Sequence, residues 1–196
     1  MFYNFCFLGH SLLVHNLPDD GNGLNIMLTF RTSNPNGLLF YTGEKDQMMV
    51  ASYLQDGVLK FKVSCGLQII LFSDPRDRVD TGFQQSVRIQ LTLDSPTMCS
   101  TVIQLNDTHT MKGEQEIVDM PTKPDMIYFG LLPHKRDPEV DMVHTGFQGC
   151  MSQLQVCNQI TVKLQMYFLV PYLHFLLYIQ SFSYNIMTFF KVVKTF

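Results

Sequence analysis

Leu24-Asn25-Ile26-Met27-Leu28-Thr29-Phe30 decides the fold, because apolar side chains stand at every second position of this stretch. Side chains of a β-strand point alternately to its two faces, so this spacing predicts a strand with one face in a core. Asn34-Pro35-Asn36-Gly37 follows, where proline fixes φ and the Asn-Gly pair tolerates positive φ. The two segments together predict a half-buried strand that ends in a tight turn.

The same rhythm continues on both sides of this strand. Residues 48–54 and 58–63 flank Gln55-Asp56-Gly57, a short hairpin signal, and residues 86–93 alternate strictly. A helical stripe of useful length is absent from the sequence before Ile160. Many short strands with turns between them predict an all-β fold over residues 5–158, a jelly-roll-like sandwich of two antiparallel sheets. Further strands are expected at 38–41, 68–72, 102–105 and 127–129, with a loop at 73–82.

Composition agrees with one well-packed domain and a short appendage. The 196 residues are 46% hydrophobic and 16% charged, which excludes a disordered chain. The formal net charge is −3 and no run of Lys or Arg occurs, which argues against a nucleic-acid partner. The N-terminal residues 1–7 are apolar but lack the basic start of a secretory signal.

The last 38 or so residues differ in kind from the rest. No charged residue occurs from Leu164 to Phe190, a length that would span a bilayer, although Pro171, His174 and Asn185 dilute it. Two interpretations stay open for residues 159–196: a membrane segment, or a truncated or alternative end foreign to the domain. Because its apolar runs do not alternate, we expect this tail outside the sandwich core, as a separate helix or a segment with few contacts.

The chain has five cysteines, an odd number that leaves at least one thiol unpaired within it. None has the C-x-x-C spacing of a zinc site. A β-turn would bring Cys150 and Cys157 together, and Cys65 is expected at a strand end as a buried thiol.

No catalytic constellation stands out in the sequence, so we predict that the chain is not an enzyme. Serines and histidines lack a nucleophile-elbow context. The carboxylates gather in expected loops, where such groups are usually only solvated: Asp74, Asp77 and Asp80, then Asp137, Glu139 and Asp141.

Five blocks in a fixed order carry a family resemblance. They are Phe7–Leu12, Leu28–Thr32 with Asn36–Tyr41, Tyr53–Leu59, Ile127–Pro133 and Gly146–Val156. Over residues 5–158 they resemble the laminin G-like domain, the module of laminin α chains, neurexins, agrin and perlecan. The chain departs from the family pattern at Phe83-Gln84-Gln85, which replaces a Trp-His pair, and in having no cysteine after Cys157.

The resemblance implies an extracellular or cell-surface adhesion and matrix-binding module, one piece of a longer protein with EGF-like or similar neighbours. Its partners would be extracellular glycans or the ectodomains of cell-surface and matrix proteins. Two alternatives stay open. A membrane-anchored adhesion protein would need a spanning tail, and a sugar-active enzyme would use the same lectin-like sandwich, because a fold does not fix a function.

The resemblance also implies particular site residues. Calcium (Ca²⁺) would be bound by Asp46, by the backbone carbonyl of Val63 and by Asp119, which flanks Thr122 at the aligned position. Because the family's partner for Cys150 is missing, we favour a disulfide between Cys99 and Cys150 or leave its pairing open. In an extracellular fold, Asn106-Asp107-Thr108 would be an N-glycosylation site at Asn106.

Overall fold

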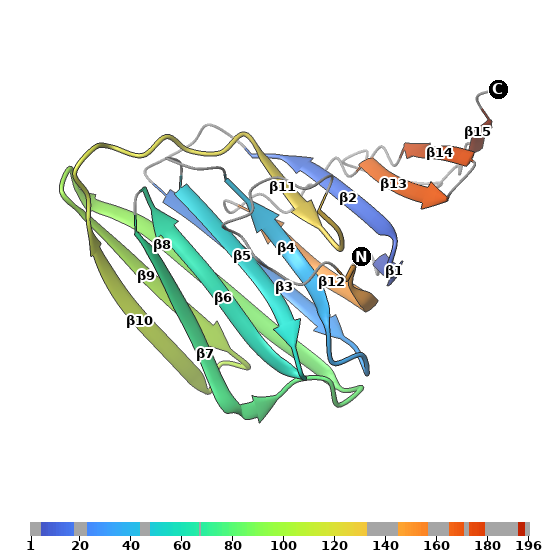
Figure 1. Cartoon of the computed structure of the whole chain (residues 1–196), viewed down its shortest axis with the longest axis horizontal. Coiled ribbons are helices and arrows are strands. Elements are labelled where there is room, and N and C mark those ends of the chain that lie inside the picture. Colours follow the sequence, from blue (N-terminus) through green and yellow to red (C-terminus); the bar gives the residue numbers. More distant parts are fainter. Residues whose placement is uncertain are drawn as a thin grey trace, which may run out of the picture.

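The computed structural model describes residues 5–17, 23–43, 48–66, 68–132, 145–156, 165–170, 173–178 and 192–194. These residues form two antiparallel sheets packed face to face, and they contain no helix (Figure 1). The predicted all-β sandwich of two sheets is therefore confirmed. No helix in the described part of the chain is long and apolar enough to cross a membrane.

The first sheet has six strands in the order β1-β12-β3-β8-β9-β10. Consecutive strands of the chain are neighbours only in the β8-β9-β10 part, so the other half is assembled from distant segments. The strands are β1 (Phe5–Leu8), β3 (Gly23–Arg31), β8 (Gln84–Ser95), β9 (Met98–Leu105), β10 (His109–Glu116) and β12 (Gln148–Val156).

The second sheet has nine strands in the order β15-β14-β13-β2-β11-β4-β5-β6-β7. The strands are β2 (Ser11–Asn16), β4 (Gly37–Thr42), β5 (Met48–Gln55), β6 (Val58–Cys65), β7 (Ile69–Arg78), β11 (Met126–Phe129), β13 (Gln165–Val170), β14 (Leu173–Tyr178) and β15 (Val192–Lys194). The chain passes from one sheet to the other between β1 and β2, so its N-terminal segment belongs to both.

The core lies between the two sheets and follows the alternation seen in the sequence. Ile26 and Leu28 of β3 are fully buried. Phe147 anchors one end of the core, with its ring edge-on to Phe7 and Phe30 at centroid distances of 5.9 and 6.2 Å. Aromatic pairs prefer such edge-to-face contacts because the rim of one ring is positive and the face of the other negative.

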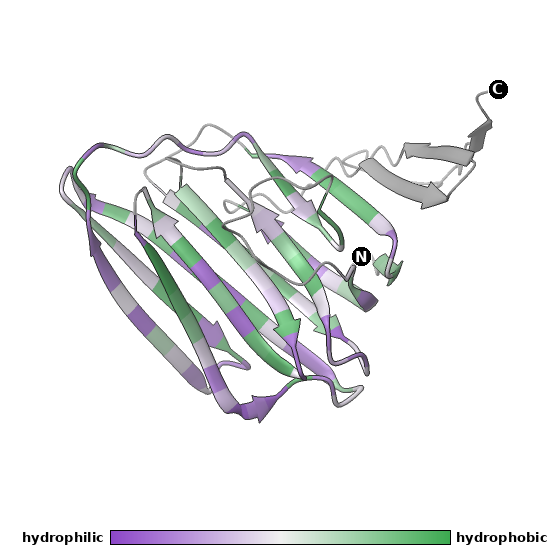
Figure 2. Cartoon of the chain, viewed as in Figure 1, coloured by the Kyte–Doolittle hydropathy of each residue, from purple (hydrophilic) through white to green (hydrophobic). Residues whose placement is uncertain are grey.

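Within the sandwich formed by residues 5–156, β7 and β10 differ from the sequence prediction, and both are edge strands. Residues 73–78 of the predicted loop 73–82 are in fact the second half of β7, which Figure 2 shows turning from hydrophobic to hydrophilic along its length, and residues 79–82 lie outside a strand as predicted. No strand was expected at β10, where the inward face carries Met111, Gly113 and Gln115 and so lacks an apolar alternation. Edge strands commonly carry charged and polar residues, because these discourage pairing with another chain.

The C-terminal tail lies beside the sandwich, where Figure 1 shows it projecting away from the two packed layers. This position outside the core agrees with the prediction. Of the two expected forms, a separate helix or a segment with few contacts, the helix is wrong for the described residues 165–170, 173–178 and 192–194, which form strands. Residues 165–168 pair in antiparallel register with 11–14 of β2, and β14 and β15 continue the sheet outward. Without the tail, β2 would be an edge strand with free backbone groups, which explains why a β-prone segment pairs with it rather than folding alone.

The two ends of the sandwich carry different connections. One, called here the hairpin end, carries the turns at 32–36, 56–57, 79–83 and 106–108. The opposite end carries the last residues of β4, the first residues of β5 and the segment 117–125 that follows β10.

Candidate functional site

One side of the sandwich is closed where edge strand β7 of the second sheet meets edge strand β10 of the first. Gly113 makes this approach feasible, because a Cβ added there would lie 2.7 Å from the Phe72 ring. We call this line of contact the seam. It consists of Val63, Cys65, Phe72, Asp74 and Asp77 on the second sheet and Cys99, His109, Gly113 and Gln115 on the first.

The Gln115 side chain joins the sheets at one end of the seam. Its Nε2 donates to the carbonyl oxygen of Val63 at 3.2 Å, and its Oε1 accepts from the backbone N–H of Cys65 at 3.0 Å. The residue is only 3% exposed. A buried amide is tolerated when both of its ends are satisfied, so Gln115 acts as a polar clasp between β10 and β6.

A disulfide between Cys65 and Cys99 lies beside this clasp, since Cys99 is the register partner of Gln115. A second disulfide joins Cys6 to Cys150, which face each other directly across β1 and β12. The predicted pair of Cys99 with Cys150 is therefore wrong, and Cys65 is not a free thiol. The reason is orientation: Cys99 is fully buried between the sheets, toward β6, whereas Cys150 lies opposite an edge strand of its own sheet.

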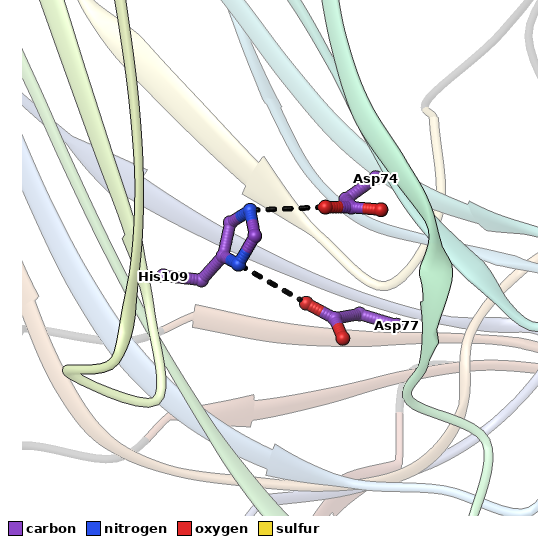
Figure 3. A group of neighbouring side chains, drawn as sticks. All are labelled: Asp74, Asp77 and His109. Carbon is purple, nitrogen blue, oxygen red and sulfur yellow. Dashed lines mark ion pairs between the residues drawn. The ribbon is translucent and has the colours of Figure 1, made fainter.

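Three ionisable side chains meet at the other end of the seam, close to the hairpin end (Figure 3). Nε2 of His109, the first residue of β10, lies 3.0 Å from Oδ2 of Asp74. Its Nδ1 lies 3.5 Å from Oδ2 of Asp77, and both carboxylates come from β7. The imidazole thus stands between two carboxylates of the other sheet.

Arg76 holds Asp74 in place. Its Nε and backbone N–H donate to Oδ1 of Asp74 at 2.9 and 3.0 Å, and its Nη2 donates to Oδ2 at 2.6 Å. This forked pairing, with a smaller contribution from His109, holds the pKa of Asp74 far below its ordinary value. The same pairing raises the pKa of Arg76. Asp74 is therefore a fixed carboxylate anion whose orientation Arg76 sets.

Of the residues predicted to bind calcium, the two that the structure describes, Val63 and Asp119, are not part of this cluster. Asp46 falls outside the described residues. Val63 is fully buried and its carbonyl already accepts the Gln115 amide, while Asp119 is exposed in the segment after β10. The carbonyl of Thr122 accepts from the N–H of Met48 at 2.9 Å, which brings the 117–125 segment to the start of β5.

The residues at hand therefore fit calcium only in part. The segment carrying Asp119 does approach the strand that Asp46 precedes, as the predicted set requires. The carbonyl of Val63 would have to bind an ion through its second lone pair or release Gln115.

Asn106 occupies the turn between β9 and β10, at the hairpin end. The residue is exposed and has a φ of 52°. Its side-chain nitrogen donates to Gln85 at 2.6 Å, and its oxygen accepts from the N–H of Ser86 at 2.9 Å. The predicted glycosylation sequon thus lies at the surface, with its amide bonded to the start of β8.

Within the described part of the chain, Asp74, Asp77 and His109 form the one cluster of three ligating side chains whose donor atoms lie within 4.8 Å of one another. Sequence reasoning noted both carboxylates but missed His109. No periodic pattern in the sequence links the two aspartates to a histidine about thirty residues later. Only the meeting of β7 with β10 brings them together.

The architecture defines a class: an antiparallel, jelly-roll-like β-sandwich. A family model for the laminin G domain matches residues 30–159. The chain therefore belongs to the laminin G domain family.

Curated relatives and solved structures agree with this family. Protein eyes shut of Drosophila melanogaster is 33% identical over 125 residues, which are 57% of this chain and 6% of that protein. The laminin subunit alpha of the same fly is 29% identical over 155 residues, 76% of this chain and 4% of that protein. The chain thus spans a few per cent of the length of these relatives. Domains LG4-5 of the mouse laminin alpha1 chain share the fold with a TM-score of 0.64 and 19% identity, covering 85% of this chain and 47% of that one.

Proposed function

We propose that this chain is an extracellular adhesion and matrix-binding domain that recognises a glycan or the ectodomain of a partner protein. The observation that carries the proposal is the family match over residues 30–159 on a two-sheet sandwich. Laminin subunit alpha and protein eyes shut, the relatives found, are both far longer than this chain, so the domain would act as one module of a larger protein.

Two cross-linked cysteine pairs support an extracellular location. Disulfides persist in oxidising compartments and are rare in the cytosol. Cys65–Cys99 joins the two sheets, and Cys6–Cys150 fastens the short edge strand β1. Both bonds therefore stabilise a fold that has to persist outside the cell.

The test is binding without turnover. The purified full chain would be offered to an array of extracellular glycans and to a panel of immobilised ectodomains, and bound ligands would be recovered and analysed by mass spectrometry. Saturable binding of a ligand that is recovered unchanged supports an adhesion module. Cleavage of the bound glycan would instead favour the sugar-active enzyme, and recovery of the expressed chain in the detergent phase of membranes would favour the membrane-anchored protein.

We further propose that calcium assists this binding at the end opposite the hairpin turns, through Asp46, the Val63 carbonyl and Asp119. The contact between Thr122 and Met48 supports this, because it draws the segment carrying Asp119 toward the strand that Asp46 precedes. A ligand that binds only the folded state raises its melting temperature by mass action. Millimolar calcium should therefore raise that temperature, and Asp46→Ala should abolish the increase. An unchanged melting curve in the wild type would rule the site out.

A further inference from the structure

The hairpin end of the seam has a donor set that the adhesion function does not use. We propose that Asp74, Asp77 and His109 bind one first-row divalent transition-metal ion, with zinc as the probe, and that this ion links the edges of the two sheets. The proposal stands independently of the adhesion function, and its site lies at the opposite end of β10 from the segment that carries Asp119.

The chemistry of the donors selects the class of metal. One imidazole nitrogen and two carboxylate oxygens suit zinc and similar ions, whereas calcium takes six to eight oxygen ligands. Donors around a tetrahedral zinc ion at about 2.0–2.2 Å lie about 3.3 Å apart. Nε2 of His109 is 3.0 Å from Oδ2 of Asp74, and its Nδ1 is 3.5 Å from Oδ2 of Asp77. One ion takes only one of the two ring nitrogens, so only the Nε2 to Oδ2 pair already stands near this spacing. One donor atom from each of the three residues lies within 4.8 Å of the other two, and the half-exposed Asp77 would close the remaining distance by a side-chain movement.

Arg76 prepares the site from outside it. Its backbone N–H and Nε donate to Oδ1 of Asp74 and its Nη2 donates to Oδ2, the oxygen that also lies 3.0 Å from Nε2 of His109, so Arg76 fixes the orientation of this carboxylate. Outer partners of this kind orient ligating carboxylates in metal sites and contribute to affinity. Arg76 also offsets one of the two carboxylate charges, so the cluster without a metal ion is only weakly anionic.

The packing of the seam fixes the distance between the two strands. The Phe72 ring lies against Gly113, four residues along β10 from His109 and two along β7 from Asp74. Because the core sets this distance, Asp74 and His109 are held close to each other before any ion arrives. Asp77 and His109 keep 44% and 34% of their side-chain surface exposed, which leaves a path for the ion and room for a water or partner ligand in a remaining position.

The competing account is a purely ionic one, in which a protonated His109 bridges the carboxylates and no metal binds. Isothermal titration of the full chain with zinc chloride at neutral pH separates the two. One zinc ion per chain, with no comparable binding of calcium by the same three residues, supports the metal site. Cobalt(II) would give a second readout, because its visible absorption reports nitrogen and oxygen donors, and a thiolate charge-transfer band would reveal binding at a cysteine instead.

Variants assign the ion to these residues. Asp77→Asn changes a half-exposed ligand and should weaken zinc binding by at least about ten-fold, the scale on which even outer partners of metal ligands act. His109→Gln should do the same and remove the cobalt bands. His10→Gln is the matched control, since His10 is exposed and outside the seam. If His109→Gln fails to fold, the zinc affinity of Asp77→Asn alone tests whether the ion is bound by this cluster.

Absence of zinc binding by the wild type would overturn the proposal in favour of the ionic bridge. Equal zinc affinity in Asp77→Asn, His10→Gln and the wild type would also overturn it, because it would show an adventitious ion only. A cobalt spectrum dominated by thiolate bands would place the ion at a cysteine and refute the assignment.

Discussion

Replacing Gln115 with methionine tests whether the seam fastens the two sheets. Methionine has nearly the same length but no hydrogen-bonding amide, so the buried N–H of Cys65 and carbonyl of Val63 both lose a partner. Each buried group left unsatisfied costs about 1–3 kcal/mol, and we expect a total loss of about 3 kcal/mol in the free energy of unfolding. With a urea m-value of about 2 kcal/mol/M, the unfolding midpoint should fall by about 1.5 M.

The assay is urea unfolding of the oxidised protein, followed by tyrosine fluorescence and far-UV circular dichroism. Gln104→Met is the matched control, because Gln104 is half-buried on the neighbouring strand β9, on the face turned away from the core. Its midpoint should move by less than about a quarter of a molar unit, in line with the ±0.5 kcal/mol of most surface substitutions. Equal midpoints for Gln115→Met and the wild type would refute the clasp.

Three further predictions concern the hairpin end, the sequon and the tail. Pairing with Arg78 lowers the pKa of Asp80, so the ionised Asp80 stabilises the fold above the ordinary aspartate pKa of ~4 and this stabilisation is lost as pH falls through the lowered pKa. In acid unfolding curves, the difference in the free energy of unfolding between the wild type and Asp80→Asn should therefore shrink below about pH 4. A difference that stays constant with pH would contradict this. In a glycosylating host, Asn106 should carry a glycan whose added mass is removed by a glycosidase. Thr108→Ala should abolish this added mass, while the hydrogen bonds of Asn106 with Gln85 and Ser86 stay in place. The same mass in both proteins would contradict the assignment. The segment 1–158 should fold alone with cooperative urea unfolding, because the described core comes from residues 5–156, and an insoluble short form beside a monomeric full chain would show that the tail belongs to the fold.

Alternation of side chains made the central strands predictable. Ile26 and Leu28 are buried as the period of two requires, and the hairpin at Asp56 and Gly57 forms where the turn residues place it. Such local signals depend only on neighbouring residues, so they survive without knowledge of the rest of the chain.

The edge strands and the seam were not predictable, because they depend on contacts between segments that are distant in the sequence. The inward face of β10 carries Gly113 and Gln115, whose roles arise only from contacts with β7 and β6. The cysteine pairs likewise follow from sheet order, since Cys6 meets Cys150 only because β1 lies beside β12. Contacts between segments that are distant in the sequence leave no periodic trace in it.

The central claim is that this chain is an extracellular laminin G domain whose sheets are cross-linked at the seam. Disulfide mapping of the protein secreted from a eukaryotic host tests it most directly, by mass spectrometry of peptides cut without reduction. The account predicts one peptide pair joining Cys65 to Cys99 and another joining Cys6 to Cys150. Peptides that join Cys99 to Cys150, or four free thiols at these positions, would contradict it.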